Sequence, residues 1–356
     1  MKITNLASPI LVPYLISGDL FCGGIKDAPI DARIKRRAES FADTWDPDNH
    51  FLKEPVKKLE GNYLYAGPLY NHFGHIMTES IHRLYAYNES YDGVVFCAAA
   101  FTVGSARKCS IPAFLNDLLG LFGIPKHKAV VVNGATICAS LDIPSPGSTL
   151  QSGPADWYLN TLKKAIAVSK KQDMPEKIYL GRSHMIGQGT VLGESYVFSK
   201  LAASGFRYFA PELFSIATQV DILASAKEIV FVEGSAIYAS EIIDEISANV
   251  YMLPRRNYDT FFRPHLESKA NFNLLGRLQD NLRLPNHSGS IKPDSPTINR
   301  CPSGIHESLV GFGLIPDTEF NIEEYLSFEN MDLVNYASGS SELYDLLLKG
   351  KADGNK

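Results

Sequence analysis

The strongest constraint on the fold of this chain is a regular alternation of two kinds of segment in its second half. Residues 176–183, 227–234 and 248–254 are short apolar runs rich in Val, Ile, Tyr and Phe, which are typical of buried strands. Residues 193–205 and 216–226 have a helical spacing of apolar positions and separate these runs. Strands that alternate with helices of this length predict βαβ units and therefore a parallel sheet.

The first half shows a similar but less regular pattern. Residues 62–69, 93–99 and 129–134 are predicted strands, and residues 111–124 are a predicted helix that ends near Gly123 and Pro125. The segment 142–157 is rich in Pro, Gly and Ser, so we predict an inter-domain connection there.

The length of 356 residues exceeds what one ordinary core accommodates. We therefore predict an α/β protein of two domains that face each other across a cleft. Residues 1–145 would form the N-terminal α/β domain and residues 146–284 the C-terminal one. Residues 285–356 are predicted to form a linker and a helical C-terminal extension, because a polar Pro/Ser-rich stretch precedes two amphipathic segments.

Composition excludes several classes of protein. A net charge of −5 without a dense Lys/Arg stripe argues against a nucleic-acid partner. The five cysteines are scattered and form no C-x-x-C pair, which argues against a disulfide framework or zinc knuckle and fits a reducing compartment. No run approaches the ~20 apolar residues of a membrane span. We therefore expect a cytoplasmic protein with at most peripheral membrane association.

Polar residues follow two of the predicted strands of the second half. Ligands of open α/β sheets bind beyond the carboxyl ends of the strands, and the residues there are Gly181-Arg182-Ser183 and Glu233-Gly234-Ser235-Ala236. Backbone N–H groups at a helix start can hold a phosphate, and an arginine can form a bidentate contact with the same anion. These segments are therefore a candidate diphosphate site, although a solvated loop and a capped turn would have the same sequence. The P-loop and dinucleotide fingerprints are both missing, so the sequence does not support an ATPase or an NAD enzyme.

The stretch 64–87 carries a second polar group. On a helical wheel His75, Glu79, His82 and Arg83 fall on one face, opposite a predominantly apolar one. This polar face lines a cleft, faces solvent, or holds a metal ion through His72, His75 and Glu79. The metal interpretation lacks the H-E-x-x-H spacing that places two histidines on one helix.

The order of these motifs resembles glycosyltransferase family 61 over roughly residues 60–265, most closely at 176–240. The residues that match the family pattern are Asn71, His75, Glu79, Arg83, Arg182, Ser183, Glu194, Gln219, Gly234, Ser235 and Ala236. The chain departs from the pattern where Glu233 replaces a histidine of the eukaryotic members, where Ile76 replaces an aromatic residue and where Ser240 replaces an asparagine.

The resemblance implies a GT-B-like fold of two Rossmann-like domains and an inverting mechanism. It also implies a nucleotide-sugar donor bound by the C-terminal domain and a glycan or lipid-linked glycan acceptor. Capsular or other surface polysaccharide biosynthesis is the expected setting. We expect no metal and no cofactor other than the donor substrate.

Inverting transfer requires a base for the acceptor hydroxyl and positive charge for the leaving nucleoside diphosphate. His75 is the first candidate base and Glu79 the second, unless Glu79 orients His75 or binds an acceptor hydroxyl. The predicted substrate-binding residues are Asn71, His72 and Arg83 on the acceptor side and Arg182, Ser183, Glu194, Gly234, Ser235 and Ala236 on the donor side. Asp46 and Asp48 form a D-x-D pattern that we interpret as a turn. Two alternatives stay open, a catalytically silent nucleotide- or sugar-binding protein and a metal-dependent hydrolase that uses His72, His75 and Glu79.

Overall fold

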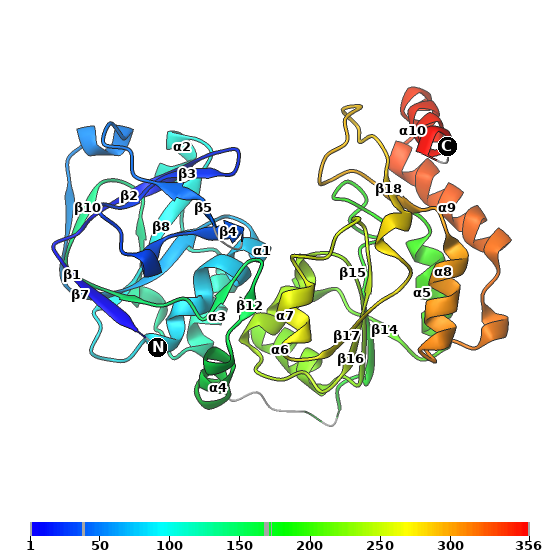
Figure 1. Ribbon diagram of the computed structural model, residues 1–356, viewed down its shortest axis with the longest axis horizontal. Helices are drawn as coiled ribbons and strands as arrows, with labels where there is room; N and C mark the ends of the chain where they lie inside the picture. The colour runs from blue at the N-terminus through cyan, green and yellow to red at the C-terminus, as the bar shows by residue number, and fades with distance from the viewer. Residues whose placement is uncertain (1, 38–39, 167–170, 172, 355–356) are drawn as a thin grey trace. The chain divides into compact units, whose positions relative to one another are not determined.

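The computed structural model describes residues 2–37, 40–166, 171 and 173–354 (Figure 1). The chain divides into two compact units. The first unit consists of Met1–Ser169, Ser215–Asp221 and Tyr238–Glu245, and the second of Lys170–Phe214, Ile222–Ile237 and Ile246–Lys356. The predicted α/β class is confirmed, whereas the domain boundaries at 145 and 284 stay predictions.

An eight-stranded mixed sheet forms the centre of the first unit, in the order β1-β10-β7-β8-β2-β3-β6 with β9 beside β8. Its strands are β1 (Ile3–Ala7), β2 (Ile10–Ser17), β3 (Leu20–Ile25), β6 (Asp43–Thr44), β7 (Lys57–Leu69), β8 (Gly93–Ala100), β9 (Ala129–Val132) and β10 (Thr136–Pro144). The strands β10, β7, β8 and β9 are mutually parallel, whereas β1 and β2 run antiparallel to β10.

Short helices and hairpins complete the first unit. The α-helices are α1 (Phe73–His75), α2 (Val103–Arg107), α3 (Ala113–Leu121) and α4 (Asp156–Ala165). The short strands are β4 (Lys35–Arg37), β5 (Ser40–Phe41), β11 (Ser148–Thr149) and β12 (Gly153–Pro154). The remaining turns are the 3-10 helices η1 (Ile30–Ala32), η2 (His50–Lys53), η4 (Ile81–Ala86) and η5 (Lys126–Lys128) and the π-helical turn η3 (Ile76–Ser80). Residues 142–157 end β10, form the β11–β12 hairpin and begin α4, all within the first unit. The prediction of an inter-domain connection there is wrong, because the prolines and glycines of this segment form a hairpin.

The second unit is built on a five-stranded parallel sheet in the order β14-β13-β15-β16-β17. These strands are β13 (Lys177–Leu180), β14 (Arg207–Tyr208), β15 (Glu228–Val232), β16 (Asn249–Leu253) and β17 (Asn271–Leu274). Between these strands the chain forms α5 (Glu194–Ala203), η6 (Pro211–Leu213), α6 (Ile216–Ser225), η7 (Ser235–Ile242) and α7 (Arg263–Glu267). The first part of α6 and the second part of η7 are counted with the first unit. The parallel sheet predicted from the alternating segments is confirmed.

The C-terminal part of the chain packs on the second unit rather than forming a separate body. It contains η8 (Leu278–Asp280), β18 (Asn281–Arg283), β19 (Thr297–Asn299), α8 (Pro302–Gly311), η9 (Asp317–Glu319), α9 (Ile322–Ala337) and α10 (Ser341–Gly354). Figure 1 shows α8 and α9 beside α5. Tyr325 of α9 is buried in one apolar cluster with Tyr196 and Leu201 of α5. Helices α9 and α10 occupy the two segments predicted to be amphipathic, and α9 shares the core of this unit.

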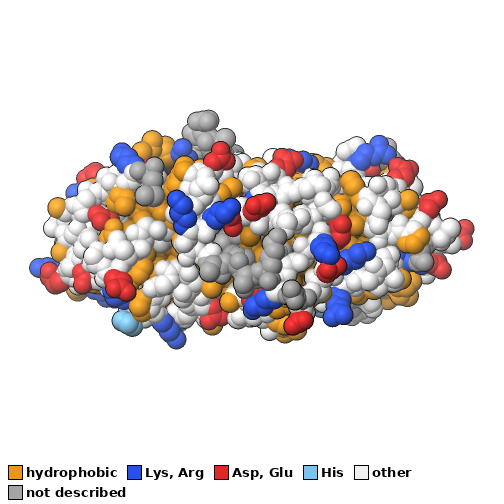
Figure 2. All heavy atoms as spheres, turned by 90° about the horizontal axis from the view of Figure 1, so that it is seen from below, with side chains coloured by type: hydrophobic (Ala, Val, Ile, Leu, Met, Phe, Trp, Pro, Cys, Tyr) orange, Lys and Arg blue, Asp and Glu red, His pale blue; other side chains and the backbone are white. Residues whose placement is uncertain are grey.

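Two surface properties bear on possible partners. Figure 2 shows Lys and Arg side chains interspersed with Asp and Glu on the face that it presents, in keeping with the small net charge. Within the part of the chain that the structure describes, no helix is long and apolar enough to cross a membrane.

Candidate functional site

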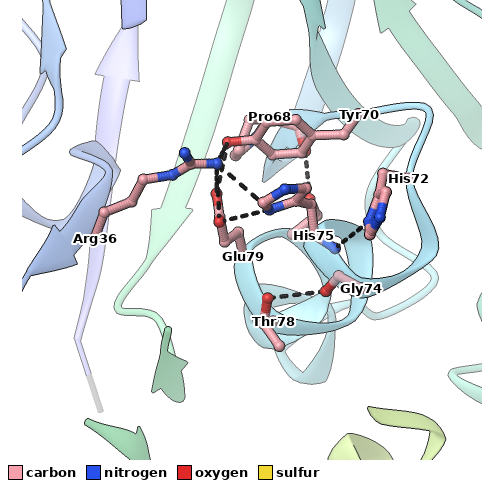
Figure 3. Close-up of polar contacts among 9 residues, drawn as sticks. Arg36, Pro68, Tyr70, His72, Gly74, His75, Thr78 and Glu79 are labelled. Atoms are coloured by element: carbon pink, nitrogen blue, oxygen red, sulfur yellow. Dashed lines mark hydrogen bonds and ion pairs between the residues drawn. The ribbon is translucent and has the colours of Figure 1, made fainter. Parts of the chain in front are cut away.

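The first group of polar side chains lies just beyond the carboxyl end of β7. After Leu69 the chain turns, and the Nδ1 atom of His72 accepts a hydrogen bond from the backbone N–H of His75 at 3.4 Å, which caps α1. The helix then widens into the π-helical turn η3, where the Thr78 hydroxyl donates to the carbonyl of Gly74 at 2.8 Å (Figure 3). Such π-helical turns occur frequently at functional sites.

Three side chains converge on the carboxylate of Glu79, which is only 3% exposed (Figure 3). The His75 Nδ1 atom is 2.9 Å from Oε1, and the Tyr70 hydroxyl donates to Oε2 at 2.5 Å. Arg36 of β4 contributes Nη2, which lies 3.1 Å from Oε1 and 3.3 Å from Oε2. Each oxygen of the carboxylate therefore contacts Arg36 and one further side chain.

These contacts determine the protonation of Glu79. Burial alone would raise the pKa of this carboxyl, but the hydrogen bond from His75 and the charge of Arg36 outweigh burial and lower the pKa. An ionised carboxylate only accepts hydrogen bonds, so the Nδ1 atom of His75 carries the proton in this contact. When the imidazole is neutral, this contact leaves the lone pair on Nε2, which is the tautomer that a general base needs.

The His75 ring is held in place on both sides. Tyr70 stacks on it at a centroid distance of 4.8 Å and an interplanar angle of 29°, and the His72 ring lies 4.9 Å away. The His75 side chain is nevertheless 37% exposed, and the neighbouring residues Asn71 and His72 are exposed as well. Burial lowers the pKa of His72, and the neighbouring His75 lowers it further. A rigid histidine that still reaches solvent is suited to proton transfer.

The predicted single polar face that includes His82 and Arg83 is wrong. The backbone passes from α-helix to π-helical turn to 3-10 helix, which changes the angular spacing, and both side chains are buried. The Arg83 Nη2 atom donates to the carbonyl of Asp31 at 2.5 Å, and its guanidinium lies 5.5 Å from the Tyr65 ring centroid. Arg83, predicted to bind substrate, is therefore part of the interior.

The second group lies beyond the carboxyl end of β13, in the second unit. Glu194, the first residue of α5, is 1% exposed, and its Oε1 atom accepts the backbone N–H groups of Arg182 at 2.5 Å and Ser183 at 3.0 Å. Burial raises the pKa of Glu194 to about 7, although these hydrogen bonds act in the opposite direction. These contacts hold the backbone of the loop, and the donor-side binding role of Glu194 stays a prediction.

The structure brings together the two segments predicted to form the diphosphate site. A Cβ atom on Gly234 would lie 2.5 Å from Nη1 of Arg182, so only glycine allows the guanidinium to lie this close to the loop backbone. The Arg182 Nε atom also donates to the carbonyl of Gly189 at 3.3 Å. Ser235 and Ala236 begin a 3-10 helix, η7, rather than the predicted α-helix, and their amides lie at its N-terminal end.

Arg255 and Arg256 join this group although sequence reasoning did not find them. They follow β16, and the buried carboxylate of Glu233 accepts the N–H of Arg255 at 2.8 Å and of Arg256 at 2.9 Å through Oε2. The other oxygen, Oε1, is 3.0 Å from Nε of Arg256. The available signal was the Pro-Arg-Arg sequence at the carboxyl end of the strand that follows β15.

The arginines repel one another across this group. Burial, together with the charges of Arg182, Arg256 and Arg283, lowers the pKa of Arg255 to about 9 against the attraction of Glu233. Burial likewise lowers the pKa of Arg182. A buried excess of positive charge costs free energy that a bound anion would offset. The arrangement therefore suits a ligand with several negative charges.

The three residues predicted as possible metal ligands, His72, His75 and Glu79, all lie within the residues that the structure describes. Across the described ranges, no group of three or more His, Cys, Asp or Glu side chains has an arrangement that could hold a metal ion. The Glu79 carboxylate is instead saturated by Arg36, Tyr70 and His75.

Residues 73–245 match the sequence model of the family Glycosyltransferase 61. The matched segment covers just under half of the chain and contains His75, Glu79, Arg182, Glu194 and Gly234. The comparison with curated proteins found no match. The resemblance stated from the sequence is confirmed by the family match.

Proposed function

We infer that this protein is an enzyme that transfers sugars, because residues 73–245 match the Glycosyltransferase 61 family model. We further propose that its donor is a nucleotide sugar and that the reaction inverts the configuration of the transferred sugar. The observation that carries this proposal is the partly buried group formed by Arg182, Arg255 and Arg256 around Glu233, beside the glycine of the 233–236 segment. A nucleoside diphosphate is an anion that such a group would bind.

Donor cleavage requires stabilisation of the leaving group. As the bond between the sugar and the diphosphate breaks, its electron pair passes to the diphosphate oxygen, where negative charge accumulates. Arg182, Arg255 and Arg256 would stabilise this charge together with the amides of Ser235 and Ala236. This positive charge would serve the purpose that a divalent cation serves in metal-dependent enzymes, so we propose a metal-independent reaction.

Acceptor activation falls to His75 in this proposal. Its Nε2 atom would remove the proton from the acceptor hydroxyl while the oxygen attacks the anomeric carbon, and Glu79 would hold the tautomer through Nδ1. Arg36 keeps Glu79 ionised and is therefore a positioning residue. A single displacement of this kind inverts the configuration at the anomeric carbon.

The proposal also includes several expectations from the sequence. These are a GT-B-like arrangement of two Rossmann-like domains, a glycan or lipid-linked glycan acceptor, and a place in capsular or other surface polysaccharide biosynthesis. A cytoplasmic location, with at most peripheral contact with a membrane, is part of the same proposal.

Calorimetry with inorganic pyrophosphate and with uridine, guanosine and cytidine diphosphates tests the donor site. We expect at least one nucleoside diphosphate to bind in the presence of a chelator. Arg182→Ala should weaken binding roughly 10- to 100-fold, the loss expected for hydrogen bonds to a charged group. Arg182→Lys should recover only part, because an ammonium retains the charge but lacks the planar guanidinium.

The matched control is Arg207→Ala, which removes an exposed arginine of β14 in the same unit and should leave binding unchanged. Equal losses for Arg182→Ala and Arg207→Ala would contradict a specific site. Binding without sugar transfer from any nucleotide sugar would instead indicate a catalytically silent nucleotide-binding protein.

A further inference from the structure

The N-cap residue of helix α5 is Gly193, which has a φ of +85° and no side chain that could cap the helix. The cap comes from α9, more than a hundred residues later in the chain. The Asp332 Oδ2 atom accepts the N–H of Gly193 at 2.7 Å, and both oxygens of Asp332 lie 3.1 Å from the Ser195 hydroxyl. A carboxylate at a helix N-terminus satisfies free N–H groups and interacts favourably with the helix dipole.

Aromatic packing fixes the same junction. A Cβ atom on Gly193 would lie 2.6 Å from the ring of Tyr325, so that glycine and ring are in direct contact. The Tyr325 hydroxyl donates to the carbonyl of Leu192 at 3.3 Å. At the start of α9, the Asn321 N–H donates to the Tyr196 hydroxyl at 2.6 Å. Helix α9 thus contacts α5 through buried and partly buried hydrogen bonds to residues on both sides of Glu194.

The next residue after Gly193 is Glu194, which connects α5 to the loop that carries Arg182. Its Oε1 atom accepts the two consecutive N–H groups of Arg182 and Ser183. A continuous series of contacts therefore runs from Asp332 to α5, then to the Arg182 backbone, and from the Arg182 guanidinium to Gly234. A displacement of α5 would shift the arginine relative to this loop.

The negative charge of Asp332 indicates that this residue holds α5 in position rather than attracting the anion. A negative charge in the same unit as an anion site opposes anion binding by Coulomb's law. Its presence is understandable if the hydrogen bonds to Gly193 and Ser195 matter more to the site than this repulsion.

We propose that helix α9, which lies outside residues 73–245, is a working part of the donor site, and that Asp332 and Glu194 are positioning residues that fix Arg182 for a diphosphate. The identity of the anion rests on the proposed function. The ordering of the 181–184 loop by Asp332 and Glu194 is independent of that function.

Two measurements on the full chain test the proposal, calorimetric binding of inorganic pyrophosphate and amide hydrogen exchange of residues 181–184 by mass spectrometry. The variant is Asp332→Asn, which preserves the shape of the side chain. The matched control is Glu324→Gln, which removes the exposed contact of 3.3 Å between Glu324 of α9 and Lys200 of α5. Exchange in β16 serves as an internal control for the fold of the unit.

We expect Asp332→Asn to weaken pyrophosphate binding roughly 5- to 10-fold, through loss of a charge-assisted cap, and to accelerate exchange in residues 181–184 but not in β16. Glu324→Gln should change neither. Tighter binding by Asp332→Asn would overturn the proposal, because it would show that the carboxylate acts only by repulsion. Unchanged exchange in residues 181–184 would overturn it as well.

If the proposed function is wrong, binding and hydrogen exchange give a different combination of results. If the wild-type protein binds neither pyrophosphate nor a nucleoside diphosphate, the donor assignment is wrong, and hydrogen exchange alone then decides the role of Asp332. Faster exchange confined to residues 181–184 would support positioning of the loop even in that case. Equal acceleration in residues 181–184 and in β16 would mean general destabilisation and would overturn the proposal.

Discussion

Glu79 in the first unit and Glu194 in the second are the same residue type, both almost fully buried, yet their pKa values shift in opposite directions. Burial acts on both carboxyls in the same sense and raises the pKa. For Glu79, the charge of Arg36 and the hydrogen bond from His75 outweigh the effect of burial on the pKa. Glu194 instead accepts hydrogen bonds mainly from uncharged backbone N–H groups. The difference shows that the partner charge, rather than burial, decides whether a buried carboxylate is ionised.

The contrast extends to chemistry. An ionised Glu79 can hold one tautomer of His75 and so prepare a base. Burial raises the pKa of Glu194 to about 7, and its carboxylate accepts the backbone N–H groups of the loop that carries Arg182. The two glutamates therefore predict different responses to substitution, and the responses can be ranked.

The largest effect is expected at His75 itself. His75→Ala should lower turnover by roughly 10²- to 10⁴-fold, the usual contribution of a general base, and leave the affinity for a nucleoside diphosphate nearly unchanged. The measurement is turnover at saturating donor together with calorimetric binding of the nucleotide. His127→Ala, at an exposed position of η5 in the same unit, is the control and should retain full turnover. If His75→Ala retains turnover but loses the nucleotide, the assignment of the two groups is reversed.

Glu79→Gln should produce the second largest effect. The amide keeps the shape of the carboxylate but loses the charge that orients His75, so turnover should fall roughly 10- to 100-fold, as for other positioning groups behind a functional histidine. Glu194→Gln should retain most turnover, since an amide oxygen can still accept the N–H groups of Arg182 and Ser183. Turnover measured in parallel for the two variants tests the comparison directly. Equal losses would show that the two carboxylates do not differ in their roles.

The smallest effect concerns stability against pH. For Glu194 the folded-state pKa of about 7 exceeds the ordinary value of 4.5, so the folded protein binds more protons than the unfolded chain between these pH values. The free energy of unfolding should therefore fall as pH rises through this window, by on the order of 1–3 kcal/mol. Glu194→Gln should lack this decline.

Glu79 should show the opposite slope. Its folded-state pKa is lowered, so its contribution to stability is present above the ordinary carboxyl pKa and is lost as the pH falls through the folded-state value. Urea unfolding of the wild type, Glu79→Gln and Glu194→Gln at a series of pH values provides the measurement. Parallel pH profiles for all three proteins would contradict the assigned protonation states.

Much of the fold could be predicted from local sequence patterns. The alternation of apolar runs and helical periods predicts the parallel sheet of the second unit, because strands and helices of this length have only a few ways to bury their apolar faces. The positions of Arg182 and Gly234 at strand ends follow from the same topology, since carboxyl ends of parallel strands share one edge of a sheet. The spacing of four residues between His75 and Glu79 already brings their side chains within reach on a helical turn.

The functional details depend on contacts that no local pattern encodes. Arg36 reaches Glu79 from 43 residues away, and Asp332 reaches Gly193 from 139 residues away. The change from α-helix to π-helical turn moved Arg83 into the interior, because a helical wheel assumes a constant angle per residue. Residue types and their spacing thus determined the strands and the candidate groups, whereas the packing of distant segments decided which carboxylate is ionised, which arginines meet and which helix holds the loop, because charge and burial are properties of the assembled tertiary structure.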